Sequence, residues 1–195
     1  MIETFSKCFA NYLVTNGADS AKENIYAYGM ECFLNEIISD FLLLFFVILF
    51  NRIFFVIVWC ISFTIIRIFL GGFHASTHAR CILIGTIIGI CSFYINPIWN
   101  YPWIFILVFI YTLILAIFYA PIIHKNHPVS PKKKVQAKKK AIFFITLESC
   151  LAFLLYPYHK ELASFIMTGF LTASLMASLA IANHKESTAK RQTNF

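Results

Sequence analysis

Charged residues are scarce in this sequence. They make up 13% of the chain, whereas hydrophobic residues make up 59% and phenylalanine alone occurs 22 times. A soluble globular domain carries about twice that share of charge. The scarcity argues against a soluble protein, and several apolar runs approach the roughly 20 residues of a membrane-spanning helix. The 195 residues therefore predict one membrane-embedded domain, residues 1–195, built as an all-helical, polytopic transmembrane bundle.

Two signals of a secreted protein are also missing. Residues 1–36 are polar and mixed, with no apolar segment that ends at a small-residue cleavage site, so we expect the first span to act as its own insertion signal. The six cysteines show no paired spacing such as CxxC, and most lie in or beside apolar runs, where a thiol behaves as a small hydrophobe. A disulfide framework is therefore not expected.

Six apolar runs predict six membrane segments. They are residues 37–50, 53–70, 82–95, 103–123, 142–156 and 162–182. The runs 37–50 and 82–95 are short, so we expect them to be tilted, partial or re-entrant. In the N-terminal region 1–36, helical spacing of apolar residues predicts an amphipathic helix over residues 2–13, which lies on the membrane or packs on the bundle. A second helix is expected from about Lys22 to Asp40.

The two signs of charge are concentrated in different parts of the chain. Residues 1–40 carry a net charge of −4, and the remainder carries +11. Residues 124–140 hold seven lysines and are expected to form a cytoplasmic loop, because short loops rich in lysine stay in the cytoplasm. Six spans then place both termini and residues 71–81 at the cytoplasmic face of the cell membrane. A short basic loop between two spans does not favour a nucleic acid partner.

The stretch RIFLGGFHASTHARCILIG, residues 67–85, gathers polar side chains in an otherwise apolar chain. Such groups are costly near lipid, so we expect them to serve a function. Gly71 and Gly72 predict a break where the second span ends. Three side chains beyond the break can do chemistry, namely His74, His78 and Cys81.

Spacing alone leaves three interpretations open. In a thiol protease, a histidine would activate Cys81; His78 lies one helical turn before it, whereas His74 reaches it only if the chain folds back at the glycines. In a zinc site, His74, His78 and Cys81 would form one helical stripe, although Ala75 stands where zinc proteases carry a glutamate. In the third interpretation the stretch is a polar helix start packed at the membrane interface.

The segment GGFHASTHARC, residues 71–81, resembles the signature of the accessory gene regulator B (AgrB) family of membrane cysteine endopeptidases. In that signature Gly-Gly, one residue and His-Ala precede a cysteine that lies seven positions after the histidine. YGMECFLNE, residues 28–36, and YAPIIHKNHPVS, residues 119–130, are similar to two further family segments in the same order. The resemblance covers essentially the whole chain. It implies a quorum-sensing function, in which the C-terminal part of an autoinducer propeptide is removed through a thioester and a thiolactone ring is formed.

The resemblance also implies the residues and partners of this reaction. Cys81 and His74, rather than His78, would form the catalytic pair, with no metal and no cofactor. The implied partners are an AgrD-like propeptide, membrane lipid and a second copy of the chain in a homodimer.

Other residues are candidates for supporting roles. Arg67 and Arg80 are candidates for stabilising a thiolate or an oxyanion, and Glu31 for orienting His74. Glu148, inside the fifth predicted span, is a candidate partner of Arg67. The lysines expected to bind an acidic propeptide tail or anionic lipid are Lys132, Lys133, Lys134, Lys138, Lys139 and Lys140.

Two rival functions remain open from the sequence. A zinc-dependent membrane protease would be sensitive to chelators. A non-enzymatic transporter or exporter would spread its polar residues over several spans at mid-depth, whereas this sequence gathers them in one stretch.

Overall fold

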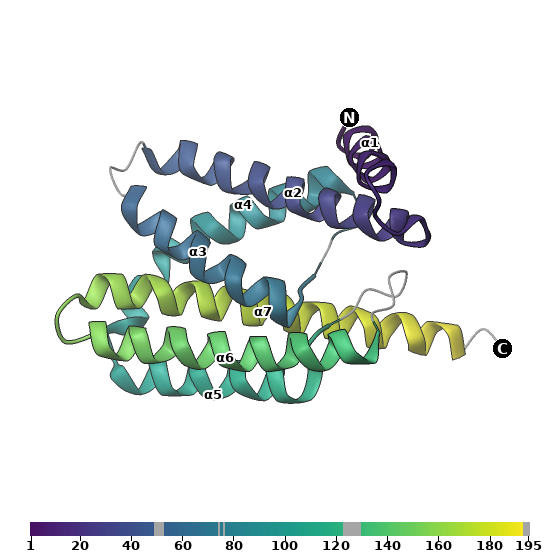
Figure 1. Ribbon diagram of the computed structural model, residues 1–195. Coiled ribbons are helices and arrows are strands. Elements are labelled where there is room, and N and C mark those ends of the chain that lie inside the picture. The colour runs from purple at the N-terminus through teal and green to yellow at the C-terminus, as the bar shows by residue number, and fades with distance from the viewer. Residues whose placement is uncertain (49–52, 74, 76, 123–129, 193–195) are drawn as a thin grey trace.

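The computed structural model describes residues 1–48, 53–73, 75, 77–122 and 130–192, and these residues are helical without any strand (Figure 1). The α-helices are α1 (Ile2–Thr15), α2 (Glu23–Ile48), α3 (Ile53–Leu70), α4 (His78–Tyr94), α5 (Pro102–Tyr119), α6 (Pro131–Leu155) and α7 (Lys160–Gln192). Two short 3-10 helices, η1 (Ser20–Lys22) and η2 (Asn96–Asn100), precede α2 and α5. The all-helical prediction is confirmed for this part of the chain.

Helix α7 is the centre of the larger group of helices. It packs against α3, α5 and α6, and its residues 163–170 are all buried. At Gly169 the backbones of α3 and α7 approach closely, because a Cβ there would lie 3.0 Å from the carbonyl oxygen of Trp59 and from the backbone nitrogen of Phe63. Small residues at such crossings let helices pack closely inside a membrane.

Helices α1, α2 and α4 form the second group. Helix α2 packs against both α1 and α4. A Cβ at Gly85 would lie 2.5 Å from Oγ of Ser39, and one at Gly89 would lie 2.6 Å from Cδ2 of Leu43. These two glycines therefore allow α4 to lie directly on α2, which holds the beginning of α4 beside the middle of α2.

The predicted membrane segments are supported only in part. Two helices are long and apolar enough to cross a membrane, Pro102–Tyr119 with a mean hydropathy of 2.4 and Lys160–Asn183 with a mean hydropathy of 1.9. The apolar helices Val56–Leu70 and His78–Tyr94 are shorter. Each predicted run lies largely in a helix of its own, but six complete spans are not confirmed.

Two predicted boundaries are wrong. Helix α2 runs without interruption from Glu23 to Ile48, so the expected second amphipathic helix and the first span are one element. Its polar residues Asn35 and Ser39 are buried against neighbouring helices rather than marking an end. The expected break of the chain at Asn51 and Arg52 lies outside the described residues.

The lysine-rich segment is the second correction. Helix α6 begins at Pro131, so Lys132–Lys140 form its first turns and not a loop. Lysine, glutamine and alanine are good helix formers, and proline fits the first position of a helix. Charge had suggested a loop, but helix propensity and the apolar continuation of α6 extend the helix into this segment. Residues 123–129 of the predicted loop lie outside the described part of the chain.

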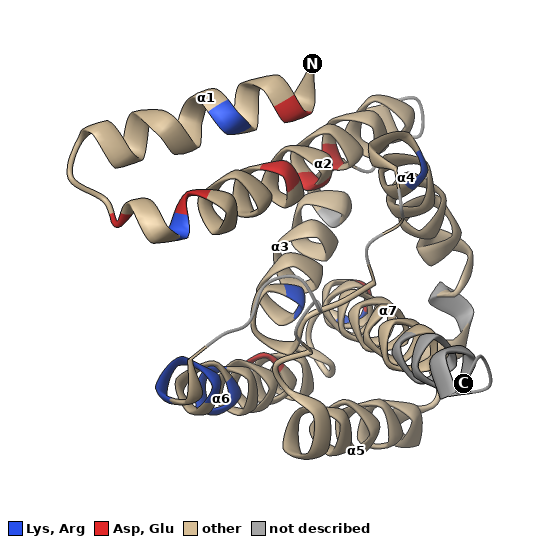
Figure 2. Cartoon of the chain, turned by 90° about the vertical axis from the view of Figure 1, so that its right-hand side faces the viewer, with Lys and Arg blue, Asp and Glu red and all other residues tan. Residues whose placement is uncertain are grey.

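Helix α1 and the end of α7 lie toward one end of the molecule, where α3 ends and α4 and α6 begin (Figure 1). Seen from that end, basic residues mark the beginning of α6 and acidic residues recur along α2 (Figure 2). The glycine-containing connection from α3 to α4 is therefore near the same end as the lysines.

Candidate active site

The predicted helix break at the glycines is present. Helix α3 ends at Leu70, Gly71 has a φ of +85°, and α4 begins only at His78. This left-handed conformation favours glycine. A Cβ at Gly71 would also lie 2.6 Å from the carbonyl oxygen of Ile122, whose own N–H donates to the carbonyl of Leu70 at 2.9 Å. The turn is thus held against the segment that follows α5.

The beginning of α4 is capped by Thr77. Its Oγ1 accepts a hydrogen bond from the N–H of Arg80 at 3.4 Å, and its carbonyl accepts the N–H of Cys81 at 3.0 Å. Cys81 therefore lies at the end of the first turn. The partial positive charge of a helix N-terminus stabilises a thiolate placed there.

Cys81 lines a pocket between α2, α3 and α4. The residues around the pocket are Asn35, Glu36, Ser39 and Asp40 of α2, Trp59, Phe63 and Arg67 of α3, and Cys81 and Gly85 of α4. The side of α2 is polar, whereas α3 contributes two aromatic rings and one cation. A thiol, two carboxyl groups and a guanidinium therefore share one small space.

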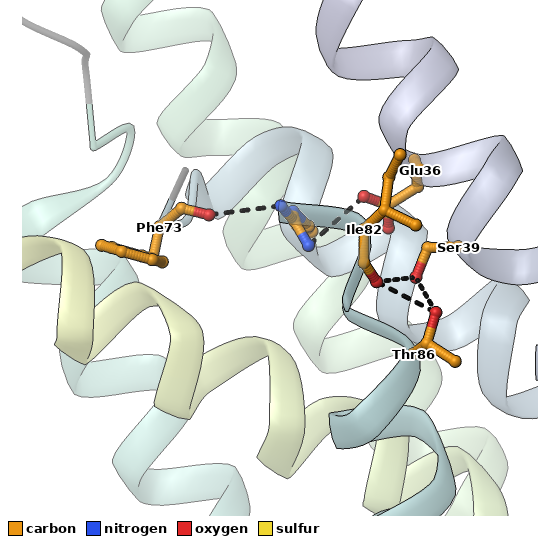
Figure 3. A network of polar contacts seen from close by, with 6 residues as sticks. Glu36, Ser39, Phe73, Ile82 and Thr86 are labelled. Carbon is orange, nitrogen blue, oxygen red and sulfur yellow. Dashed lines mark hydrogen bonds and ion pairs between the residues drawn. The ribbon is translucent and has the colours of Figure 1, made fainter. Parts of the chain in front are cut away.

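Arg67 is held in this pocket by three contacts. Its Nη1 lies 3.3 Å from Oε2 of Glu36, its Nη2 donates to the carbonyl of Phe73 at 3.3 Å, and its guanidinium lies 5.3 Å from the ring centre of Phe63. In Figure 3 the ion pair is the dashed line that ends at Glu36, and the hydrogen bond is the dashed line that ends at Phe73. The side chains of Arg67 and Glu36 are only 10% and 18% exposed, so their attraction is weakly screened.

The predicted pair of Arg67 with Glu148 is wrong. Glu148 accepts a hydrogen bond from Oγ of Ser62 at 2.6 Å, and its other carboxyl oxygen, Oε1, has no hydrogen-bond partner among the described residues. Gly72 lies beside Arg67 instead, since a Cβ there would be 3.5 Å from Cγ and Nε of the arginine. A Cβ at position 72 would therefore be in ordinary van der Waals contact with the arginine side chain.

A second set of polar contacts joins α2 to α4 at residues that follow Cys81 in α4. Oγ of Ser39 lies 3.3 Å from both the carbonyl oxygen of Ile82 and Oγ1 of Thr86 (Figure 3). These contacts fix the first turns of α4 against α2, and with them the position of Cys81.

Both ring nitrogens of His78 face oxygen atoms of other helices. Nδ1 lies 3.2 Å from Oδ1 of Asn35 on α2, and Nε2 lies 3.7 Å from Oε1 of Glu3 on α1. The argument from spacing favoured His78 as the base for Cys81. In the structure His78 is the first residue of α4 and contacts both α1 and α2. Its role toward Cys81 stays a prediction.

His74 lies outside the described residues, so its pairing with Cys81 stays a prediction. Helix α4 begins four residues after His74, and the continuous helical stripe of His74, His78 and Cys81 that the zinc interpretation requires is therefore not formed. In the described part of the chain, no group of three or more His, Cys, Asp or Glu side chains is placed to hold a metal ion.

The other predicted supporting residues lie away from the pocket lining. Arg80 is exposed and Glu31 is half-buried, and neither lines the pocket with Cys81. The predicted lysines lie on the first turns of α6, where Lys140 contacts the ring of Phe69 with its Nζ 5.8 Å from the ring centre.

The sequence argument missed the polar side of α2. Cys32, Asn35, Glu36, Ser39 and Asp40 recur every three or four residues and so lie along one side of the helix. Cys32 interacts electrostatically with Cys81. Burial is the main reason that the pKa of the Cys32 thiol is raised, and a hydrogen bond from Tyr28 acts in the opposite direction. Polar residues at helical spacing within an apolar run were the signal that could have found this side.

Comparison with known proteins agrees with the motifs. The profile of the family described as Accessory gene regulator B matches residues 6–179. A Clostridium perfringens (strain 13 / Type A) protein named as AgrB-like protein 2 is 27% identical over 157 residues, which cover 75% of this chain and 73% of that protein. An AgrB-like protein of C. perfringens (strain SM101 / Type A) is 27% identical over 159 residues with the same coverage. No solved structure gives a significant match.

Proposed function

Because this chain belongs to the accessory gene regulator B family, we propose that it is a membrane cysteine endopeptidase that processes an AgrD-like autoinducer propeptide. Family membership links the chain to peptide processing, and the two candidate spanning helices agree with a membrane location. The observation that carries the proposal is the placement of Cys81, at the capped beginning of α4, in one pocket with Arg67.

The proposed reaction begins with transfer of the Cys81 proton to His74. The thiolate attacks the scissile carbonyl, and the negative charge that develops on the carbonyl oxygen is stabilised by Arg67 and the N-terminus of α4. When the peptide C–N bond breaks, His74 returns the proton to the leaving amine and a thioester to Cys81 remains. The C-terminal fragment then leaves.

Ring closure follows by thioester exchange. A cysteine within the bound peptide attacks the thioester carbonyl, a thiolactone forms, and the Cys81 thiolate is released with its proton restored from the attacking thiol. One thioester replaces another, so little energy is lost and no ATP is needed. Aromatic walls such as Trp59 and Phe63 limit water in the pocket, which protects the acyl-enzyme from hydrolysis.

The membrane arrangement is part of the same proposal. The protein is multi-pass, with the pocket of Cys81 at the cytoplasmic face, and it works as a homodimer. The lysines of α6 bind the acidic tail of the propeptide or anionic lipid, because six exposed or half-buried lysines in three turns create a strongly positive surface.

The experiment is mass spectrometry of the purified protein in liposomes after mixing with its propeptide. We expect a peptide adduct on Cys81 in the wild type and in His78→Ala. We expect none in Cys81→Ala or His74→Ala, and a chelator should have no effect. Cys81→Ser tests whether a hydroxyl can replace the thiol. Cleavage that survives Cys81→Ala would contradict the thiol mechanism, and cleavage abolished by the chelator would favour a zinc protease.

A further inference from the structure

Helix α1 has three different sides. Ser6 and Ala10 are fully buried, and α1 packs on α2. Phe5, Phe9 and Tyr12 recur at three- and four-residue spacing, and 54%, 36% and 63% of their surfaces are exposed. The helix therefore uses its small residues to contact the bundle and leaves its aromatic side uncovered.

The third side of α1 is polar. Thr4, Lys7 and Asn11 are exposed and follow one another at the same helical spacing. A helix that touches only protein and water needs no exposed aromatic side. One side on protein, one aromatic and one polar is the pattern of a helix that lies along a lipid–water boundary.

The orientation of α1 agrees with this pattern. Helices α5, α6 and α7 are seen lengthwise across Figure 1, whereas α1 is seen nearly end-on. It lies toward the end of the molecule where α6 begins and α7 ends, and Figure 2 shows it lengthwise from that end. If α5 and α7 cross a membrane, α1 lies parallel to its surface at the lysine-rich face.

We propose that the aromatic side of α1, formed by Phe5, Phe9 and Tyr12, is a lipid-binding surface that inserts between the acyl chains at the cytoplasmic boundary. The proposal rests on the membrane location within the proposed function. Helix α2, on which α1 packs, itself exposes Phe33, Phe41 and Phe45, as a helix next to lipid does.

Size argues against a second copy of the chain as the occupant. An aromatic side chain buries about 150–250 Å², so three that are already partly covered supply less than the roughly 800 Å² per partner of a stable protein interface. Lipid needs no matching surface, and tyrosine is favoured where an aromatic ring meets the headgroup region.

The lipid-bound helix contacts the helix that carries Cys81. Glu3, on the first turn of α1, reaches the ring of His78, three residues before Cys81. Insertion of α1 in the membrane surface therefore helps to position α4, the helix that carries Cys81, at the surface where the propeptide is presented.

The test places a benzophenone amino acid at position 5, 9 or 12 of the full-length protein in vesicles of phosphatidylglycerol and phosphatidylcholine. After irradiation, mass spectrometry of the N-terminal peptide identifies what each probe has captured. We expect lipid adducts from all three aromatic positions, and at least fivefold less lipid adduct from the same probe at Asn11 on the polar side. The probe replaces an exposed side chain at each of the three positions, so misfolding is not expected. If one variant does misfold, the other two still give the result.

Three outcomes would overturn the proposal. They are capture of a second copy of the chain, capture of added propeptide in place of lipid, and equal lipid capture at Asn11. Propeptide cleavage is measured on the same vesicles. An inactive protein with lipid adducts would contradict the proposed function alone, whereas an active protein without them would contradict this proposal alone.

Discussion

The guanidinium of Arg67 and the carboxylate of Glu36 form an ion pair, 3.3 Å apart, across the pocket that Cys81 lines. The pair joins the last turn of α3 to the middle of α2. With the Phe73 carbonyl as a second acceptor, the arginine is held in one orientation beside the pocket that Cys81 also lines.

Glu36→Gln is expected to lower kcat/KM about tenfold or more, and Arg67→Gln about 100-fold, because loss of one preorganised charge at a developing oxyanion costs about 10²–10³ in rate. Both variants should also unfold at lower temperature, since one member of a buried pair is left alone. Propeptide cleavage and a thermal melt in detergent give the two readouts.

Glu31→Gln is the matched control for that experiment. It removes a carboxylate from the same helix, but from a position that does not line the pocket. Equal losses of cleavage in Glu31→Gln and Glu36→Gln would show that general acidity of α2, and not the contact with Arg67, matters.

His78→Ala is expected to reduce cleavage less than tenfold, because His78 contacts Asn35 and Glu3 and acts by joining helices. Loss of a general base would cost about 10²–10⁴. Glu3→Gln should produce a loss of the same kind, and the double variant should lose little more than His78→Ala, since coupled residues are non-additive. A loss above 100-fold in His78→Ala alone would make it the base and contradict this role.

Gly71→Ala is expected to destabilise the protein by about 1–3 kcal/mol, the usual cost of holding a side chain in an unfavourable backbone region. The φ of +85° and the Ile122 carbonyl 2.6 Å from the new Cβ both oppose the change. Chemical denaturation in mixed micelles measures it. Gly29→Ala is the control, since Gly29 lies inside α2 and no atom of the described residues would lie within 4 Å of a Cβ there. This variant should be neutral or stabilised by up to ~1 kcal/mol.

Neutralising the α6 lysines is expected to raise KM for an acidic propeptide more than it lowers kcat. The change replaces Lys132, Lys133, Lys134, Lys138, Lys139 and Lys140 with glutamine, which removes attraction but keeps helix propensity. Replacing the same six with arginine keeps the charge and is the control. The wild-type KM should rise with salt, because exposed charges are screened. An unchanged KM in the glutamine variant would exclude these lysines from substrate binding.

Local features were predictable because they depend on neighbouring residues. The end of α3 followed from Gly71 and Gly72, and the predicted apolar run 142–156 ends one residue after α6 does. The amphipathic helix α1 was also predictable from the spacing of its apolar residues. The side on which α1 packs against the bundle was not. Ser6 and Ala10 pack on α2 because small side chains allow close approach, and the aromatic side stays outside.

The sequence by itself determined the class of the chain, its helical content and the motif that holds Cys81, since these depend on composition and on spacing within one segment. Tertiary structure decided the partners. Arg67 contacts Glu36 and not Glu148 because α2 lies beside the end of α3. Glu148 on α6 instead accepts a hydrogen bond from Ser62, which lies earlier in α3 than Arg67. Both acids are polar groups in apolar helices, Glu148 buried and Glu36 half-buried, and only the packing of those helices determines which one an arginine can reach.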